Sequence, residues 1–420
     1  MRILFVTPYL PSPARFGAQR RIDGLMRGLS ERHEISVLSF ATAGLDVAGL
    51  DLGTAVAATR SYCEKVITVP YDVLNVETGK KRILQLASLA SRRSFESLLM
   101  HRPEFQVALD RLLAQGHYDV VEVEFSQMGI YRFARRVTGS PLFVLDEHNI
   151  EYDLIRRTAE APGDRARRLY SAVNWRKLKR EELDAWRRFD GITLTSSRDR
   201  DLVLQELPGA RTRVIPNAVD VDAFRPNNTP REPATLLFLG AINYFPNTDG
   251  ILHFLDTTFP RILAARPDVK LQIVGMGPPE SVLSRRADNV EITGFVEDPL
   301  PYLDRATLVI VPLRIGGGTR FKVVEAMAKG KTIVSTRLGA EGIDLEHERD
   351  VLFADTPEDF AAQVIRALSD KELADRLGRA ARTLAEDRYS WRAAVAAMEE
   401  FYGEIAAAPA FVRAEPALAS

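Results

Sequence analysis

The chain has 420 residues, of which 46% are hydrophobic and 27% charged, a composition typical of a globular protein with two or three domains. Its 56 Lys and Arg residues nearly balance 57 Asp and Glu residues, so it lacks the basic excess expected of a nucleic-acid-binding protein. Cys63 is the single cysteine, which excludes an internal disulfide and a cysteine pair that could hold a metal.

The first half of the chain alternates short apolar segments with helical patterns. Strand, helix and strand follow one another within its first 40 residues or so, and such a βαβ unit predicts a parallel sheet. Residues 1–208 are therefore expected to form a Rossmann-like domain. Its predicted strands are 2–7, 34–40, 66–69, 120–123, 142–145 and 191–195.

A second βα series follows a linker that the prolines and asparagines of 213–226 predict. Residues 209–390 are expected to form a second Rossmann-like domain, and 391–405 a helix that returns to the first one. The tail 406–420 is rich in Ala and Pro and is expected to be disordered. The fold class is thus α/β, with two doubly wound domains facing a central cleft. The expected strands are 235–239, 270–274, 290–293, 308–311 and 331–335, with helices at 250–266 and 321–329.

The most informative segment comes after the strand 308–311. It contains three consecutive glycines, Gly316, Gly317 and Gly318. Glycines let backbone approach a ligand closely, and a helix that begins at Thr319 as its N-cap would offer free N–H groups to a phosphate. Arg320 and Lys322 place two cations where the helix dipole disfavours them, unless a bound diphosphate offsets the charge. The alternative is a flexible loop with a surface ion pair between Lys322 and Glu325.

This segment resembles the donor-site signature of glycosyltransferase family 4, the retaining enzymes of the GT-B architecture. The second half of that signature matches Glu325-Ala326-Met327-Ala328 with Gly330. Its first glutamate would fall at Gly317, so the chain is similar to a subgroup with Gly-Gly-Gly-Thr-Arg-hydrophobic-Lys there. The resemblance implies a retaining hexosyltransferase of cell-surface polysaccharide synthesis, with a UDP- or GDP-linked sugar as donor.

A second departure from the family lies after the strand 235–239. The family carries an arginine and a lysine there that contact the donor diphosphate, whereas Ala241 follows Gly240 and Asn247 stands near the expected lysine. Our hypothesis is that Arg320 and Lys322 take over these contacts. The family resemblance extends to the linker 214–220, to Gly275 and Gly277, and to the strand end that lies against the nucleotide base, Phe295 and Val296.

In the N-terminal domain the resemblance places Gly17 near the transferring sugar. Arg20 or Arg21 is expected to meet a phosphate or an anionic acceptor, or else to begin a solvated helix. His148 follows the strand 142–145, where relatives place a histidine close to the donor sugar. With Glu325 it would hold sugar or ribose hydroxyls, although a structural or surface histidine is the alternative.

Two glutamates of the strand region 120–124, Glu122 and Glu124, leave a glycosidase with paired carboxylates as a competing interpretation. Further alternatives are a sugar-nucleotide epimerase of the same architecture and a nucleotide-sugar-binding protein that has lost catalysis. A dinucleotide-dependent oxidoreductase is disfavoured, since the first βα loop lacks Gly-x-Gly-x-x-Gly. No resident cofactor or metal is expected.

Residues 80–102 carry six Lys and Arg side chains against Glu96 alone, with apolar residues between them. This pattern predicts a basic amphipathic helix that lies on anionic lipid or packs on its own domain. The sequence contains no stretch of about 18 uncharged apolar residues, the length that a membrane-spanning helix needs. We therefore expect a cytoplasmic protein, peripheral at the inner membrane face if 80–102 binds lipid, with a glycan, lipid-linked or small-molecule acceptor.

Overall fold

The computed structural model describes residues 1–42, 51–135, 139–160, 165–316 and 318–408. The chain divides into two compact units. The N-terminal unit holds Met1–Ile215 and the chain from Val395 onward, and the C-terminal unit holds Pro216–Ala394. The expected boundaries, after residues 208 and 390, lie a few residues before these divisions.

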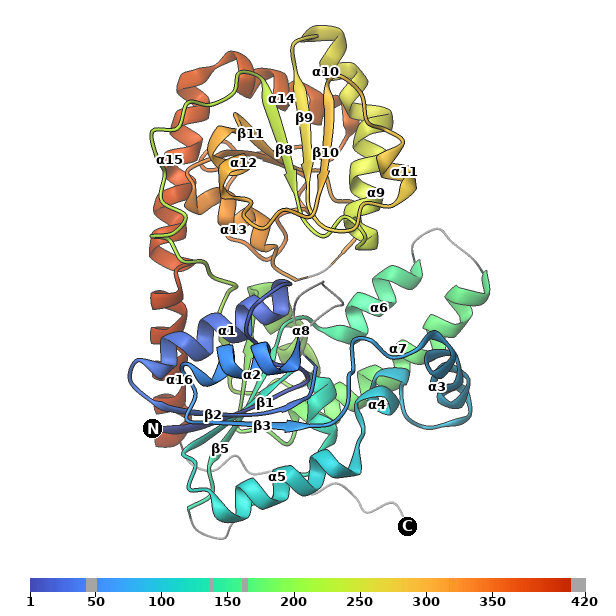
Figure 1. The fold of residues 1–420 in the computed structure, drawn as a ribbon, viewed down its shortest axis with the longest axis vertical. Coiled ribbons are helices and arrows are strands. Elements are labelled where there is room, and N and C mark those ends of the chain that lie inside the picture. The colour runs from blue at the N-terminus through green and yellow to red at the C-terminus, as the bar shows by residue number, and fades with distance from the viewer. Residues whose placement is uncertain (43–50, 136–138, 161–164, 317, 409–420) are drawn as a thin grey trace. The chain divides into compact units, whose positions relative to one another are not determined.

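The N-terminal unit is built on a seven-stranded parallel sheet in the order β3-β2-β1-β4-β5-β6-β7. Its central strands are almost entirely buried, as expected for a parallel sheet that helices cover on both faces, and β4 and β5 carry carboxylates besides their apolar residues. Helices α1 (Gly17–Ser30) and α2 (Leu52–Arg60) lie on one face and α5 (Pro103–Gln115) on the other (Figure 1). The strands are β1 (Arg2–Thr7), β2 (Glu34–Phe40), β3 (Lys65–Val69), β4 (Val120–Glu124), β5 (Leu142–Glu147), β6 (Gly191–Leu194) and β7 (Thr212–Val214).

The last helix of the chain, α16 (Trp391–Ala407), completes the N-terminal unit from Val395 onward. Its Tyr402 hydroxyl donates a hydrogen bond of 2.9 Å to the Glu122 carboxylate inside the sheet region. A Cβ added at Gly191 would lie 2.3 Å from Ile405, so the helix sits directly on the start of β6. The helix includes the first two residues of the predicted tail, and 409–420 lie outside the described residues.

The C-terminal unit is a doubly wound domain on a six-stranded parallel sheet, in the order β10-β9-β8-β11-β12-β13 (Figure 1). The predicted pair of Rossmann-like domains is therefore confirmed. The strands are β8 (Thr235–Leu239), β9 (Lys270–Val274), β10 (Val290–Gly294), β11 (Leu308–Val311), β12 (Thr332–Ser335) and β13 (Leu352–Phe353). The helices are α9 (Phe245–His253), α10 (Phe259–Ala265), α11 (Glu280–Leu283), α12 (Leu300–Arg305), α13 (Phe321–Ala328), α14 (Pro357–Ser369) and α15 (Lys371–Arg388).

The helix predicted at 250–266 begins earlier and is interrupted. A π-helical turn over Phe254–Thr258 separates α9 from α10. The N–H of Phe259 bonds to the carbonyl of Phe254, five residues back, and Pro260 has no N–H with which to continue the ordinary ladder. The edge strands β7 and β13 were not predicted, because three and two residues are too few to show a pattern.

The single helix predicted at 80–102 is wrong, because two helices cover this region. Helix α3 (Thr78–Ala90) ends before Ser94, whose side chain caps α4 (Phe95–Met100) by accepting from the N–H of Ser97. Helix α3 packs on α7 (Arg165–Trp186), where Lys177 donates to the carbonyls of Ser88 and Ser91. In the part of the chain that the structure describes, no helix is both long and apolar enough to span a bilayer. The remaining helices of this unit are a 3-10 turn (Ser126–Ile130), α6 (Glu151–Glu160) and α8 (Ser197–Glu206).

Candidate functional site

The loops that follow β8, β9, β10 and β11 lie at one edge of the C-terminal sheet, because these strands are parallel. Two glycines allow the first two loops to touch. A Cβ added at Gly275 would lie 1.6 Å from the carbonyl oxygen of Gly240, and both residues have positive φ values of about 150°. The backbone at this edge is therefore unusually close-packed and free of side chains.

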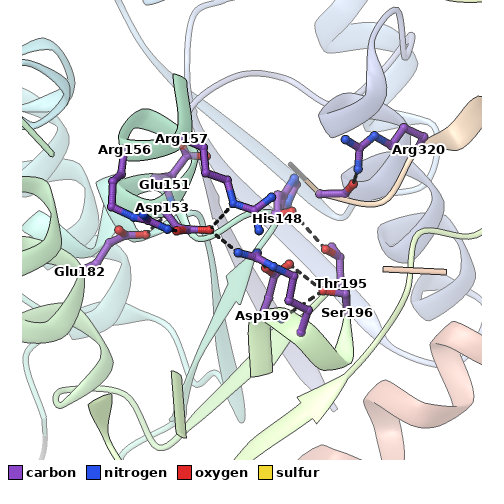
Figure 2. A network of polar contacts seen from close by, with 12 residues as sticks. His148, Glu151, Asp153, Arg156, Arg157, Glu182, Thr195, Ser196, Asp199 and Arg320 are labelled. Carbon is purple, nitrogen blue, oxygen red and sulfur yellow. Dashed lines mark hydrogen bonds and ion pairs between the residues drawn. The ribbon is translucent and has the colours of Figure 1, made fainter. Parts of the chain in front are cut away.

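The loop after β11 leads into α13 through Gly316, Gly318 and Thr319, while Gly317 lies outside the described residues. The prediction that Thr319 is the N-cap is wrong: the N-cap is Arg320, and no side chain caps the helix. The Arg320 guanidinium turns back and donates to the carbonyl of Gly318 (Figure 2). The Thr319 hydroxyl is buried and has no hydrogen-bond partner among the described residues. The start of α13 thus combines uncapped N–H groups, a cation and a buried hydroxyl.

Lys322 lies in the first turn of α13, two residues after Arg320, and is buried rather than on the surface. Its ammonium donates a 2.8 Å hydrogen bond to Oδ1 of Asn247 and lies 4.1 Å from the centre of the Phe238 ring. Burial, with a contribution from Arg320, lowers the pKa of Lys322 to about 7. Glu325 is buried too, at 6% exposure, so the alternative of a surface pair between Lys322 and Glu325 is wrong.

The loop after β10 carries the residues expected to lie against a nucleotide base. Phe295 is 52% exposed, and Val296 packs partly against the core. Gly294, with φ of 77°, ends the strand just before them. Their contact with a base stays a prediction.

The N-terminal unit has its own polar cluster, where β4 and β5 end. His148 is buried, and its Nε2 lies 2.7 Å from a Glu124 carboxylate oxygen and 3.5 Å from Asp146. The ring of Phe125, a residue with an unusual φ of 68°, lies 3.9 Å from the His148 ring, centre to centre. Thr195 donates to the His148 carbonyl (Figure 2). His148 is therefore held from several sides, and a surface histidine is excluded.

Burial and neighbouring charges shift the pKa values of this cluster. Burial and the Asp146 carboxylate raise the pKa of Glu124 to about 7. Burial alone would lower the pKa of His148, but the carboxylates of Asp146 and Glu124 outweigh it and raise that pKa. The three side chains offer possible metal-ligand atoms within 4.8 Å of one another, and the buried Arg21 guanidinium supplies positive charge beside them.

Of the two arginines expected to meet an anion or to lie in a solvated helix start, Arg21 does neither, because it is buried. It is 1% exposed, and its Nε and Nη2 bind the two carboxylate oxygens of Asp146 at 2.7 and 2.8 Å. Its Nη1 donates to the carbonyl of Ile215, the last residue of the N-terminal segment of this unit. Sequence reasoning missed this pair because its members are 125 residues apart. Gly17, by contrast, is exposed at the start of α1, after the N-cap Phe16.

The interpretation as a glycosidase is wrong, because the side chains of Glu122 and Glu124 are fully buried and cannot contact a glycan.

Another buried carboxylate that the sequence did not reveal, Glu182, accepts hydrogen bonds at the start of α6. Glu182 accepts from the N–H groups of Glu151 and Tyr152 at 2.9 and 2.8 Å, which fixes the helix that follows His148 (Figure 2).

Comparison with known proteins matches both units to glycosyltransferase families. A family model described as Glycosyltransferase Family 4 matches residues 17–223, and one described as Glycosyl transferases group 1 matches residues 233–370. The chain is 29% identical over 222 residues to phosphatidyl-myo-inositol mannosyltransferase of Mycolicibacterium smegmatis, covering 48% of this chain and 54% of that protein. It spans between 36% and 57% of the length of the curated relatives that it matches.

Among solved structures, sucrose-phosphate synthase of Thermosynechococcus elongatus superposes with a TM-score of 0.69 at 17% identity, covering 97% of this chain and all of that one. HepE of Anabaena, in complex with UDP and glucose, gives a TM-score of 0.66 at 15% identity, covering 96% of this chain and all of HepE. The two family models together span most of the chain, and with its two parallel sheets they show that it belongs to the glycosyltransferases of the GT-B fold.

Proposed function

We propose that the chain is a retaining glycosyltransferase that moves a hexosyl group from a UDP- or GDP-linked sugar to a hydroxyl of a glycan or lipid-linked acceptor in cell-surface glycan synthesis. The observation that carries the proposal is the buried Lys322 ammonium, which forms no ion pair with any described carboxylate and lies in the first turn of an uncapped helix. An anionic ligand would supply the missing charge. The mycobacterial relative is named a mannosyltransferase, and HepE is solved with UDP and glucose.

In the proposed mechanism the protein stabilises the leaving group. Arg320, Lys322 and the amides of the glycine loop would bind the diphosphate as its negative charge grows. The acceptor hydroxyl would attack the anomeric carbon on the face from which the nucleoside diphosphate departs, and its proton would pass to the leaving phosphate. His148 and Glu325 would hold sugar or ribose hydroxyls, so that the two substrates are oriented for attack.

Thermal-shift screening against UDP- and GDP-linked sugars tests the donor assignment. A true donor at roughly 100 times its Kd should stabilise the chain by about 2.7 kcal/mol, because it binds only the folded state. The double variant Arg320→Ala, Lys322→Ala should lose most of this shift, whereas Lys331→Met, at the amino end of β12, should keep it. If the double variant binds the donor like the wild type, the diphosphate assignment is wrong.

The anomeric configuration of the product, read by NMR, separates the remaining alternatives. An α-linked donor should give an α-linked product. Inversion would contradict the retaining mechanism, and isomerisation of the donor without acceptor would indicate an epimerase. Donor binding with neither transfer nor slow donor hydrolysis would indicate an inactive binding protein.

We also propose that α3 and α7 contact anionic membrane. Ile83 and Leu86 on α3 are each 67% exposed, and Leu169 on α7 is 71% exposed, on two helices that pack together. Lys80, Lys81 and Arg82 open α3, so apolar and cationic side chains share this region.

Sedimentation with phosphatidylglycerol vesicles at low salt tests the membrane contact. The variant Ile83→Asp, Leu86→Asp should bind at least about tenfold more weakly than wild type, because it removes two apolar anchors and adds negative charge. Val107→Asp, which changes an exposed residue of α5, is the matched control and should bind normally. A wild-type chain that stays in the supernatant would refute the contact.

A further inference from the structure

Two hydrogen bonds through the side chain of Asn247 connect the loop after β8 to the first turn of α13. The Nδ2 group of Asn247, near the start of α9, donates a 2.8 Å hydrogen bond to the carbonyl of Ala241. Its Oδ1 accepts the 2.8 Å hydrogen bond from the Lys322 ammonium. The NH2 group of the amide can only donate and its oxygen can only accept, so these two hydrogen bonds fix the amide in a single orientation.

The ammonium is thereby held over the end of β8. A Cβ added at Gly240 would lie 2.9 Å from both Lys322 Nζ and Asn247 Nδ2, so the absence of a side chain at position 240 makes room for the pair. The ring of Phe238, on β8 itself, covers another side of the ammonium. An ammonium has three N–H groups, and its hydrogen bond to Asn247 uses one of them.

The positive charge of the Lys322 ammonium is not fully compensated by the charged groups around it. Arg320 repels the ammonium, and Glu325, one turn further along α13, attracts it. The side chains that touch it from the other elements, Phe238 of β8 and Asn247 of α9, are uncharged. Burial then dominates, and the pKa of Lys322 falls to about 7. A diphosphate beside the ammonium would favour the charged form again.

We infer that Asn247 is a positioning residue of the donor site, which holds the Lys322 nitrogen over Gly240 to meet the donor diphosphate. This inference rests on the proposed function. The family has cations near positions 241 and 247 that contact the diphosphate, and this chain has Ala241 and Asn247 instead. The inference explains how such a site can still bind a diphosphate, because Asn247 holds the ammonium of Lys322 from α13 in place. It also predicts that donor affinity falls by up to about tenfold per pH unit above pH 7, because the bound state needs a proton that the free protein has lost.

Titration calorimetry with UDP-glucose and GDP-mannose at pH 8, in HEPES and in Tris, tests the inference. The diphosphate of a nucleotide sugar does not titrate near this pH, so the difference in heat between the buffers counts protons taken up by the protein. Wild type should take up most of one proton. Lys322→Met should take up none and bind at least about tenfold more weakly, since a hydrogen bond to a charged group is lost. Lys331→Met should match wild type in both respects.

Asn247→Asp separates positioning from mere packing, since it preserves the shape of the side chain. Its carboxylate should keep Lys322 protonated in the free protein, so proton uptake should vanish, and repulsion of the diphosphate should weaken binding at least about tenfold. Asn247→Leu should weaken binding by about tenfold and retain proton uptake. The inference is overturned if wild type takes up no proton, or if Asn247→Asp keeps wild-type affinity and uptake. A wild-type chain that binds neither nucleotide sugar would instead argue against the proposed function, and the inference would fall with it.

Discussion

Replacing Lys322 with methionine should stabilise the folded chain by about 2–3 kcal/mol near pH 6, and most of this gain should disappear towards pH 10. The buried ammonium has a pKa of about 7, against an ordinary value of 10.5. Each unit of difference corresponds to ~1.4 kcal/mol, so the full cost of the charge is at most roughly 5 kcal/mol. Methionine fills the space without that charge.

The pH window follows from the direction of the shift. Below pH 7 both the folded and the unfolded chain hold the Lys322 proton, and the cost of burying the charge is fully present. Between about pH 7 and 10.5 the unfolded chain holds the proton and the folded chain does not, so the stability of wild type rises with pH. The advantage of the methionine variant should shrink over this range.

Urea denaturation of both proteins near pH 6, 8 and 10 measures this effect. Lys331→Met offers a contrast, because the Lys331 ammonium donates to two carbonyls, those of Asp304 and Ala306, whereas Lys322 donates to Asn247 alone among the described residues. Methionine would leave both carbonyls unpaired, and burial lowers the pKa of Lys331 less than that of Lys322, to about 8. That variant should be destabilised. A Lys322→Met variant less stable than wild type near pH 6 would show that the ammonium is not costly to bury.

Asp146→Asn should destabilise the N-terminal unit by about 3–5 kcal/mol, because it leaves the buried Arg21 guanidinium without a carboxylate. Burial alone would raise the pKa of Asp146, but Arg21 and His148 hold it well below its usual range. The carboxylate therefore stabilises the fold at every pH above that range, and its contribution is lost only in strong acid. The cost of the variant should accordingly be constant around neutrality.

Tryptophan fluorescence can follow unfolding in urea, since two of the three tryptophans, Trp175 and the buried Trp186, lie in the same unit. The double variant Arg21→Met, Asp146→Leu should recover part of the loss, since a buried ion pair replaced by apolar side chains costs less than one broken in half. An Asp146→Asn variant within about 1 kcal/mol of wild type would contradict the assigned role of the pair.

Eleven of the strands in the two sheets were predictable, because most of them are buried and largely apolar segments between turn residues, a signal carried by neighbouring residues. Strands β2 and β8 begin and end where expected. The short edge strands and the π-helical turn lacked such a signal. The glycine loop, Arg320 and Lys322 were also predictable as a site from neighbouring residues. Two cations near a helix N-terminus are unfavourable on their own, and this conflict is visible within a few residues of the sequence.

The contacts that give these side chains their roles were not predictable, because they join distant segments. Asn247 lies 75 residues from Lys322, and Arg21 lies 125 residues from Asp146. From neighbouring residues alone, Lys322 was expected to meet a diphosphate or to pair with Glu325 at the surface, and Arg20 or Arg21 to meet an anion or to lie in a solvated helix start. The structure places Lys322 and Arg21 inside the protein, where each forms hydrogen bonds with residues far away in the sequence.

The position of α16 has a consequence for synthesis on the ribosome. The N-terminal unit is discontinuous in sequence, and the residues that cover Glu122 and Gly191 are made only after the whole of Pro216–Ala394. A nascent chain can therefore close its second unit before its first, although domains usually fold in order from the N-terminus. Until the final helix emerges, part of the core of the first unit stays uncovered, and such exposed apolar surface is what a chaperone can bind.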